Sequence, residues 1–143
     1  MTEQVDFYIL EDADPHAKLR AACRIIQKAF SQGLKVYAQT AGPAQSEALD
    51  RLLWTFSQGS FIPHAIADPE PRPWPDYPVQ LGAGPPPAGA EVLINMADGD
   101  PGQPRPCRRI IELVGAAAPD KAAGRQRFRA YREQGLEPNT HRL

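Results

Sequence analysis

The chain has 143 residues and a formal net charge of -1, which fits one ordinary globular domain. Its apolar runs are too short to cross a bilayer, and the opening MTEQVDFYIL lacks the basic start and apolar core of a signal peptide. We therefore expect a single domain over residues 1–143 and a cytoplasmic location. Cys23 and Cys107 suit neither a disulfide framework nor a metal site, and Cys23 is expected in the core.

The first half of the chain alternates strand and helix patterns. Residues 5–10 (VDFYIL) predict a buried strand, and Asp14 then predicts the N-cap of a helix that ends at Gly33. Residues 34–40 (LKVYAQT) predict a second strand, and a second helix should follow Pro43 and end near residues 57–59. Its core-facing residues should be Ala48, Leu52 and either Trp54 or Phe56. This order predicts an α/β fold with a mostly parallel sheet.

The second half contains short strands and a last helix. Residues 60–66 (SFIPHAI) predict a third strand, which Pro63 restricts to an edge or an end. Residues 67–90 hold eight of the 16 prolines, so we expect an extended connection inside the domain, with a short strand at 79–82. Further strands are predicted at 91–96 and 108–114, and the last helix from about Pro119 to Gln134.

The sequence lacks the usual signals of nucleotide binding and of catalysis. The turn after the first strand, LEDADPHAK, has no glycine, and its Glu11, Asp12 and Asp14 would repel a phosphate. The three histidines are far apart, and His64 is expected to be structural or solvent-facing. The carboxylates of residues 97–100 (ADGD) are interpreted as a solvated turn rather than a metal site. We therefore expect no cofactor and no metal.

The last predicted helix carries a concentrated positive charge. Residues 121–132 contain five basic residues and no acid, so the rest of the chain carries 11 basic against 17 acidic residues. At 100° per residue, one side of this helix is both basic and aromatic. That side consists of Lys121, Arg125, Phe128, Arg129 and Arg132. A solvated helix face is one interpretation, but Phe128 favours the wall of a pocket.

Two kinds of anion suit such a patch. The phosphates of nucleic acid bind lysine and arginine whatever the base sequence. The acidic remainder of the chain, however, would repel a long nucleic-acid strand. A short acidic peptide needs only one patch, and an arginine can hold its terminal carboxylate while an apolar slot takes a terminal aromatic ring. A nucleotide-binding enzyme that reuses the parallel sheet is a third hypothesis. Direct binding of single-stranded DNA by the basic helix is a further alternative.

Several stretches together resemble the chi subunit of bacterial DNA polymerase III, an accessory subunit of the clamp loader. They are VDFYIL, ALDRLLWTFSQGSFIPH at 48–64, EVLINM, and RFRAYREQGLEPNT at 127–140. The resemblance implies a Rossmann-like, three-layer α/β/α fold without a phosphate-binding loop. It also implies a non-enzymatic adaptor of the replicative polymerase.

The same resemblance implies two partners on separate surfaces. Chi proteins bind the acidic, phenylalanine-ended tail of the single-stranded-DNA-binding protein. The matching positions here are Val114, Lys121, Arg125, Phe128 and Arg129. Chi proteins also bind a psi subunit, which tethers them to the clamp loader, and the matching region is around Trp54 and Phe61. A repair helicase is a further candidate for that aromatic surface, for which core packing is the alternative interpretation.

Overall fold

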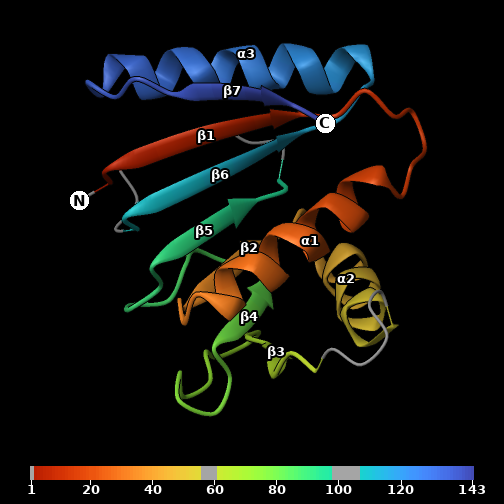
Figure 1. Ribbon diagram of the computed structural model, residues 1–143, viewed down its shortest axis with the longest axis vertical. Helices are drawn as coiled ribbons and strands as arrows, with labels where there is room; N and C mark the ends of the chain where they lie inside the picture. The colour runs from red at the N-terminus through yellow and green to blue at the C-terminus, as the bar shows by residue number, and fades with distance from the viewer. Residues whose placement is uncertain (1, 56–60, 98–106) are drawn as a thin grey trace.

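The structure is a computed structural model that describes residues 2–55, 61–97 and 107–143. Helices and strands alternate through these residues (Figure 1). In chain order they are β1 (Gln4–Ile9), α1 (Ala17–Ser31), β2 (Val36–Gln39), α2 (Pro43–Thr55), β3 (His64–Ile66), β4 (Val79–Gly82), β5 (Val92–Asn95), β6 (Arg109–Val114), α3 (Ala118–Glu133) and β7 (Asn139–Arg142).

The described strands form one parallel sheet in the order β3-β4-β2-β5-β6-β1-β7. Helices α1 and α2 pack on one face and α3 packs on the other, so the domain has three layers. Parallel sheets need cover on both faces, which explains why the central strands are apolar on both sides. The predicted three-layer α/β fold with a mostly parallel sheet is confirmed.

Alternation along each strand divides the core between the two faces. In β2, Val36 and Ala38 face the core with α1 and α2, while Tyr37 between them faces the other core. In β1, Phe7 belongs to the core beneath α3. Cys23 is fully buried under α1, as expected, and burial raises the pKa of its thiol to about 12. This thiol is therefore protonated at neutral pH and is not a nucleophile.

The proline-rich segment 67–90 is part of the domain. The hydroxyl of Tyr37 donates to the carbonyl of Gly84 at 2.8 Å, and the indole N–H of Trp74 donates to the carbonyl of Ala88 at 2.9 Å. The side chain of Gln80 accepts from the N–H of Arg72 and donates to its carbonyl, at 3.0 and 2.8 Å. These bonds hold the segment on the sheet, and the strand expected at 79–82 is β4.

Three local predictions need correction. Helix α1 begins at Ala17, with His16 as its N-cap residue rather than Asp14. Helix α2 buries Ser46, Leu49 and Leu53 most fully, whereas the expected Ala48 and Leu52 are half-buried, with Leu52 packed against the core, and Trp54 is exposed. Ser46 tolerates burial because its hydroxyl bonds that of Thr40 at 2.7 Å. Strand β7 was not predicted at all, because all four of its residues are polar and exposed.

Some predictions fall outside the described residues, namely Phe56, the helix end at 57–59, and most of the ADGD turn. In the described part of the chain, no helix is both long and apolar enough to cross a membrane.

Candidate functional site: a cationic pocket between α3 and β7

Helix α3 lies very close to the sheet because its contact face includes a glycine. A methyl group added at Gly124 would stand 3.0 Å from both terminal carbons of Val114 on β6. A methyl group at this distance would be closer to Val114 than normal packing allows, so any side chain larger than that of glycine would push the helix outward. Phe128, one turn further along α3, packs against Phe7 with ring centroids 5.2 Å apart. The aromatic residue of the basic helix is therefore half-buried against β1.

A buried ionic cluster anchors α3 to β6. The carboxylate of Glu112 accepts from the guanidinium of Arg127 and from the amide of Asn95, both at 2.9 Å, and from the hydroxyl of Tyr131. Glu112 and Arg127 are 0% and 2% exposed, so neither charge is compensated by water. Breaking such a pair leaves an uncompensated buried charge, which is strongly destabilising. Arg127 is therefore structural, and it is not among the residues that the helical spacing places on the basic, aromatic side of α3.

A pocket of about 310 Å³ opens beside the exposed face of α3. Its apolar lining consists of Phe7, Ile9, Val114 and Phe128. Lys121 and Arg125 stand one helical turn apart on its α3 wall. Neither cation has an ion-pair partner among the residues that the structure describes. The structure thus brings together four of the five residues expected at the tail-binding site.

Arg129 is the residue that does not join them. It is exposed on α3 but does not line the pocket, and the same holds for Arg132 in the last turn. Phe7, Ile9 and Gly124 also line it, although sequence reasoning did not place them there. The remaining two lining residues, Thr140 and Arg142 of β7, were missed as well. Only their polar character was visible in the sequence, because neither periodicity nor hydrophobicity marks a strand at 139–142.

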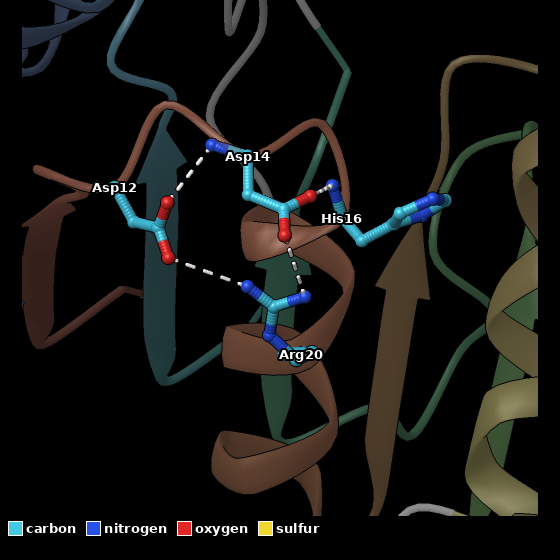
Figure 2. Close-up of polar contacts among 4 residues, drawn as sticks. All are labelled: Asp12, Asp14, His16 and Arg20. Atoms are coloured by element: carbon cyan, nitrogen blue, oxygen red, sulfur yellow. Dashed lines mark hydrogen bonds and ion pairs between the residues drawn. The ribbon is translucent and has the colours of Figure 1, made fainter.

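The turn between β1 and α1 differs sharply in charge from this pocket. Figure 2 shows the carboxylates of Asp12 and Asp14 turned toward the guanidinium of Arg20, with N to O distances of 3.3 Å each. The backbone N–H of His16 donates to Asp14, and this bond together with Arg20 holds the pKa of that carboxyl below its usual range. Two acidic side chains thus stand where nucleotide-binding α/β folds place a phosphate.

A second exposed feature lies at the other edge of the sheet. Trp54 at the end of α2 and Phe61 before β3 are 53% and 65% exposed, and their ring centroids are 5.6 Å apart. The buried imidazole of His64 packs beneath Trp54, with ring centroids 4.6 Å apart. Its Nε2 lies 3.0 Å from a carboxylate oxygen of Asp50. His64 is thus structural, one of the two alternatives expected. The core-packing alternative for Trp54 and Phe61 is wrong, because both rings face solvent.

Comparison with known proteins identifies the family. The family model described as "DNA polymerase III chi subunit, HolC" matches residues 1–139. The chain belongs to the DNA polymerase III chi subunit family. It is 42% identical over 141 residues to DNA polymerase III subunit chi of Pseudomonas aeruginosa, covering 98% of this chain and 96% of that protein. It is 24% identical over 138 residues to subunit chi of Escherichia coli strain K12, covering 94% of each chain.

Family membership confirms the resemblance seen in the sequence. The relatives to which the chain is similar are subunits of DNA polymerase III. Within the described residues, no three histidine, cysteine or acidic side chains gather in a way that could hold a metal ion.

Proposed function

We propose that this chain is a non-catalytic, cytoplasmic adaptor of the replicative DNA polymerase. In this proposal it binds the acidic carboxyl-terminal tail of the single-stranded-DNA-binding protein in the pocket beside α3. The observation that carries the proposal is the combination of an apolar lining with Lys121 and Arg125 on one wall of the pocket. Nucleic acid is then contacted only indirectly, through the coated strand.

The chemistry of the pocket suits a peptide that ends in phenylalanine. Its lining offers the aromatic faces of Phe7 and Phe128 to a ring, while Lys121 and Arg125 are placed to receive the terminal carboxylate. Charge-assisted hydrogen bonds contribute about 1.5 to 3 kcal/mol each. With one buried ring, and after the cost of ordering the peptide, the expected binding free energy is near about -8 kcal/mol, a micromolar affinity. Arg129 would act from outside the pocket, on acidic residues further along the tail.

The aromatic surface supports the second half of the proposal. Trp54 and Phe61 form an exposed aromatic pair, the residue type that most often anchors a protein partner. We assign this surface to a psi-type subunit that links the chain to the clamp loader. A repair helicase that competes for the same two rings is an extension of the same proposal.

Fluorescence anisotropy with a short labelled peptide, rich in aspartate and ending in phenylalanine, tests the tail-binding site. We expect micromolar binding to the wild type and at least about tenfold weaker binding to Arg125→Ala, since one charge-assisted contact is lost. Equal binding by both proteins, or no binding by either, would show that the site is assigned wrongly.

Two alternatives make different predictions. Direct binding of single-stranded DNA by α3 predicts a complex that weakens steeply with salt and needs no partner protein. The burial of Arg127 counts against it, because one of the five cations is already neutralised inside the protein. A nucleotide-binding enzyme predicts a rise in melting temperature with ATP or NAD. The carboxylates of Asp12 and Asp14 at the β1–α1 turn oppose it.

A further inference from the structure

The register of β7 places one more cation at the pocket. Strand β7 pairs in parallel with β1, and Phe7 lies beside Thr140 while Ile9 lies beside Arg142. Phe7 and Ile9 face α3, so Thr140 and Arg142 face α3 as well, and all four line the pocket. His141 between them faces the opposite side, where it stacks on Tyr8 and lies 3.0 Å from Asp6. The alternation along β7 therefore assigns Arg142 to the pocket.

Arg142 stands on a different wall from the cations of α3. Lys121 and Arg125 come from the helix, whereas Arg142 comes from the edge strand of the sheet. The Arg142 side chain is 77% exposed, which places it at the rim. Its guanidinium lies 3.9 Å from the carboxylate of Glu11, just beyond the carboxyl end of β1. An exposed pair at this distance is weak, so an anionic ligand can replace Glu11 at little cost.

We infer that Arg142 binds an acidic side chain of the tail that precedes its terminal residue, and so selects acidic tails over merely aromatic-ended ones. This inference rests on the proposed tail-binding function of the same pocket. In the proposed function, the apolar lining contacts the ring of the terminal residue, and the two α3 cations bind its carboxylate. A third cation at the rim on the opposite wall is placed for a second anion, where the peptide leaves the pocket.

The position of Arg142 relative to the family match bears on its role. The family model matches residues 1–139, so Arg142 lies beyond the matched residues. Lys121, Arg125 and Phe128 all lie within them. We therefore assign binding of the terminal residue to α3, and an added preference for upstream acid to Arg142 on the edge strand.

A double-mutant cycle across the interface tests the inference. Wild type and Arg142→Gln are titrated by anisotropy with three labelled peptides. These are an aspartate-rich peptide ending in phenylalanine, the same peptide with asparagine in place of aspartate, and the aspartate-rich peptide with an amidated end. We expect Arg142→Gln to weaken binding of the first and third peptides about fivefold and to leave the second unchanged, because the lost contact is an exposed charge pair. Arg125→Ala should instead lose its effect with the amidated peptide.

Two further variants make the result specific. Arg24→Gln, which removes an exposed charge on α1 at the other face, should bind all peptides like the wild type. Glu11→Gln should bind the aspartate-rich peptide about twofold more tightly, because it releases Arg142 and removes a repelling charge. Peptide binding that depends on Arg125 but not on Arg142 would overturn this inference alone. An absence of peptide binding to the wild type would overturn the proposed function together with it.

Discussion

At the scale of single residues, two arginines of α3 have different roles although their side chains are identical. Arg125 and Arg127 are two positions apart, which places them about 200° apart around the helix. Arg125 is exposed at the pocket, whereas Arg127 is buried against Glu112. One is therefore available to a ligand, and the other holds the helix that presents it.

This contrast predicts two separable phenotypes. Arg127→Ala should lower the free energy of unfolding by about 3 to 5 kcal/mol, because it leaves the Glu112 carboxylate buried without its cation. Arg125→Ala should change it by less than about 0.5 kcal/mol, as expected for an exposed residue. Urea denaturation measures both. Similar stabilities of the two variants would contradict the assignment of Arg127 to the buried cluster.

At the scale of elements, β7 is a strand that contributes no buried side chain to the core. All four of its residues are exposed, and it is held by backbone pairing with β1 and by the buried carboxylate of Asp6, which lies 3.0 Å from His141. Burial alone would raise the pKa of Asp6. The bonds from His141 and Gln4 and the nearby charge of Arg109 outweigh burial, so the pKa lies below its usual range.

The lowered pKa gives the stabilisation by Asp6 a definite pH dependence. The contribution is complete above the unfolded-state pKa of about 3.9 and is lost as the pH falls through the lower folded-state value. We therefore expect Asp6→Asn to cost about 1 to 2 kcal/mol at pH 5, with a smaller difference from the wild type near pH 3. Urea denaturation of both proteins at the two pH values measures this. A difference that does not shrink toward low pH would show that the ionised carboxylate is not what holds β7.

At the scale of the whole molecule, the two candidate partner surfaces lie at opposite edges of the sheet (Figure 1). The pocket adjoins β7, while Trp54 packs over His64 at the start of β3. Six strand spacings separate these edges, a distance of about 29 Å before twist is considered. The two surfaces share no residue among those that the structure describes.

This separation predicts that the two surfaces act independently. Trp54→Ala should leave the affinity for the acidic peptide unchanged, and combining it with Arg125→Ala should give the sum of the two single effects within about 0.5 kcal/mol. Anisotropy titrations of the two single variants and the double variant measure this. A larger interaction free energy would mean that the surfaces are coupled through the sheet, against the proposed arrangement.

Local pattern was enough to predict most elements and the fold class. The strands at 5–10, 34–40, 79–82, 91–96 and 108–114 and the three helices of the described residues are visible in the sequence, because apolar periodicity and glycine or proline stops are local signals. The predicted face of α2 is only partly right, because Leu49, Leu52 and Leu53 form two neighbouring stripes, and the packed sheet buries Leu49 and Leu53 more fully than Leu52. Strand β7 carries no apolar signal, so only its pairing with β1 reveals it.

The sequence by itself determined the acidic first turn, the absence of a phosphate loop and the basic, aromatic face of the last helix, because each lies within a few adjacent residues. Tertiary structure decided that Arg127 is buried, since its burial depends on an ion pair with Glu112 of β6. It also decided that Trp54 and Phe61 are exposed and that Arg142 reaches the pocket. These are contacts between distant segments, and a one-dimensional pattern does not encode which segments meet.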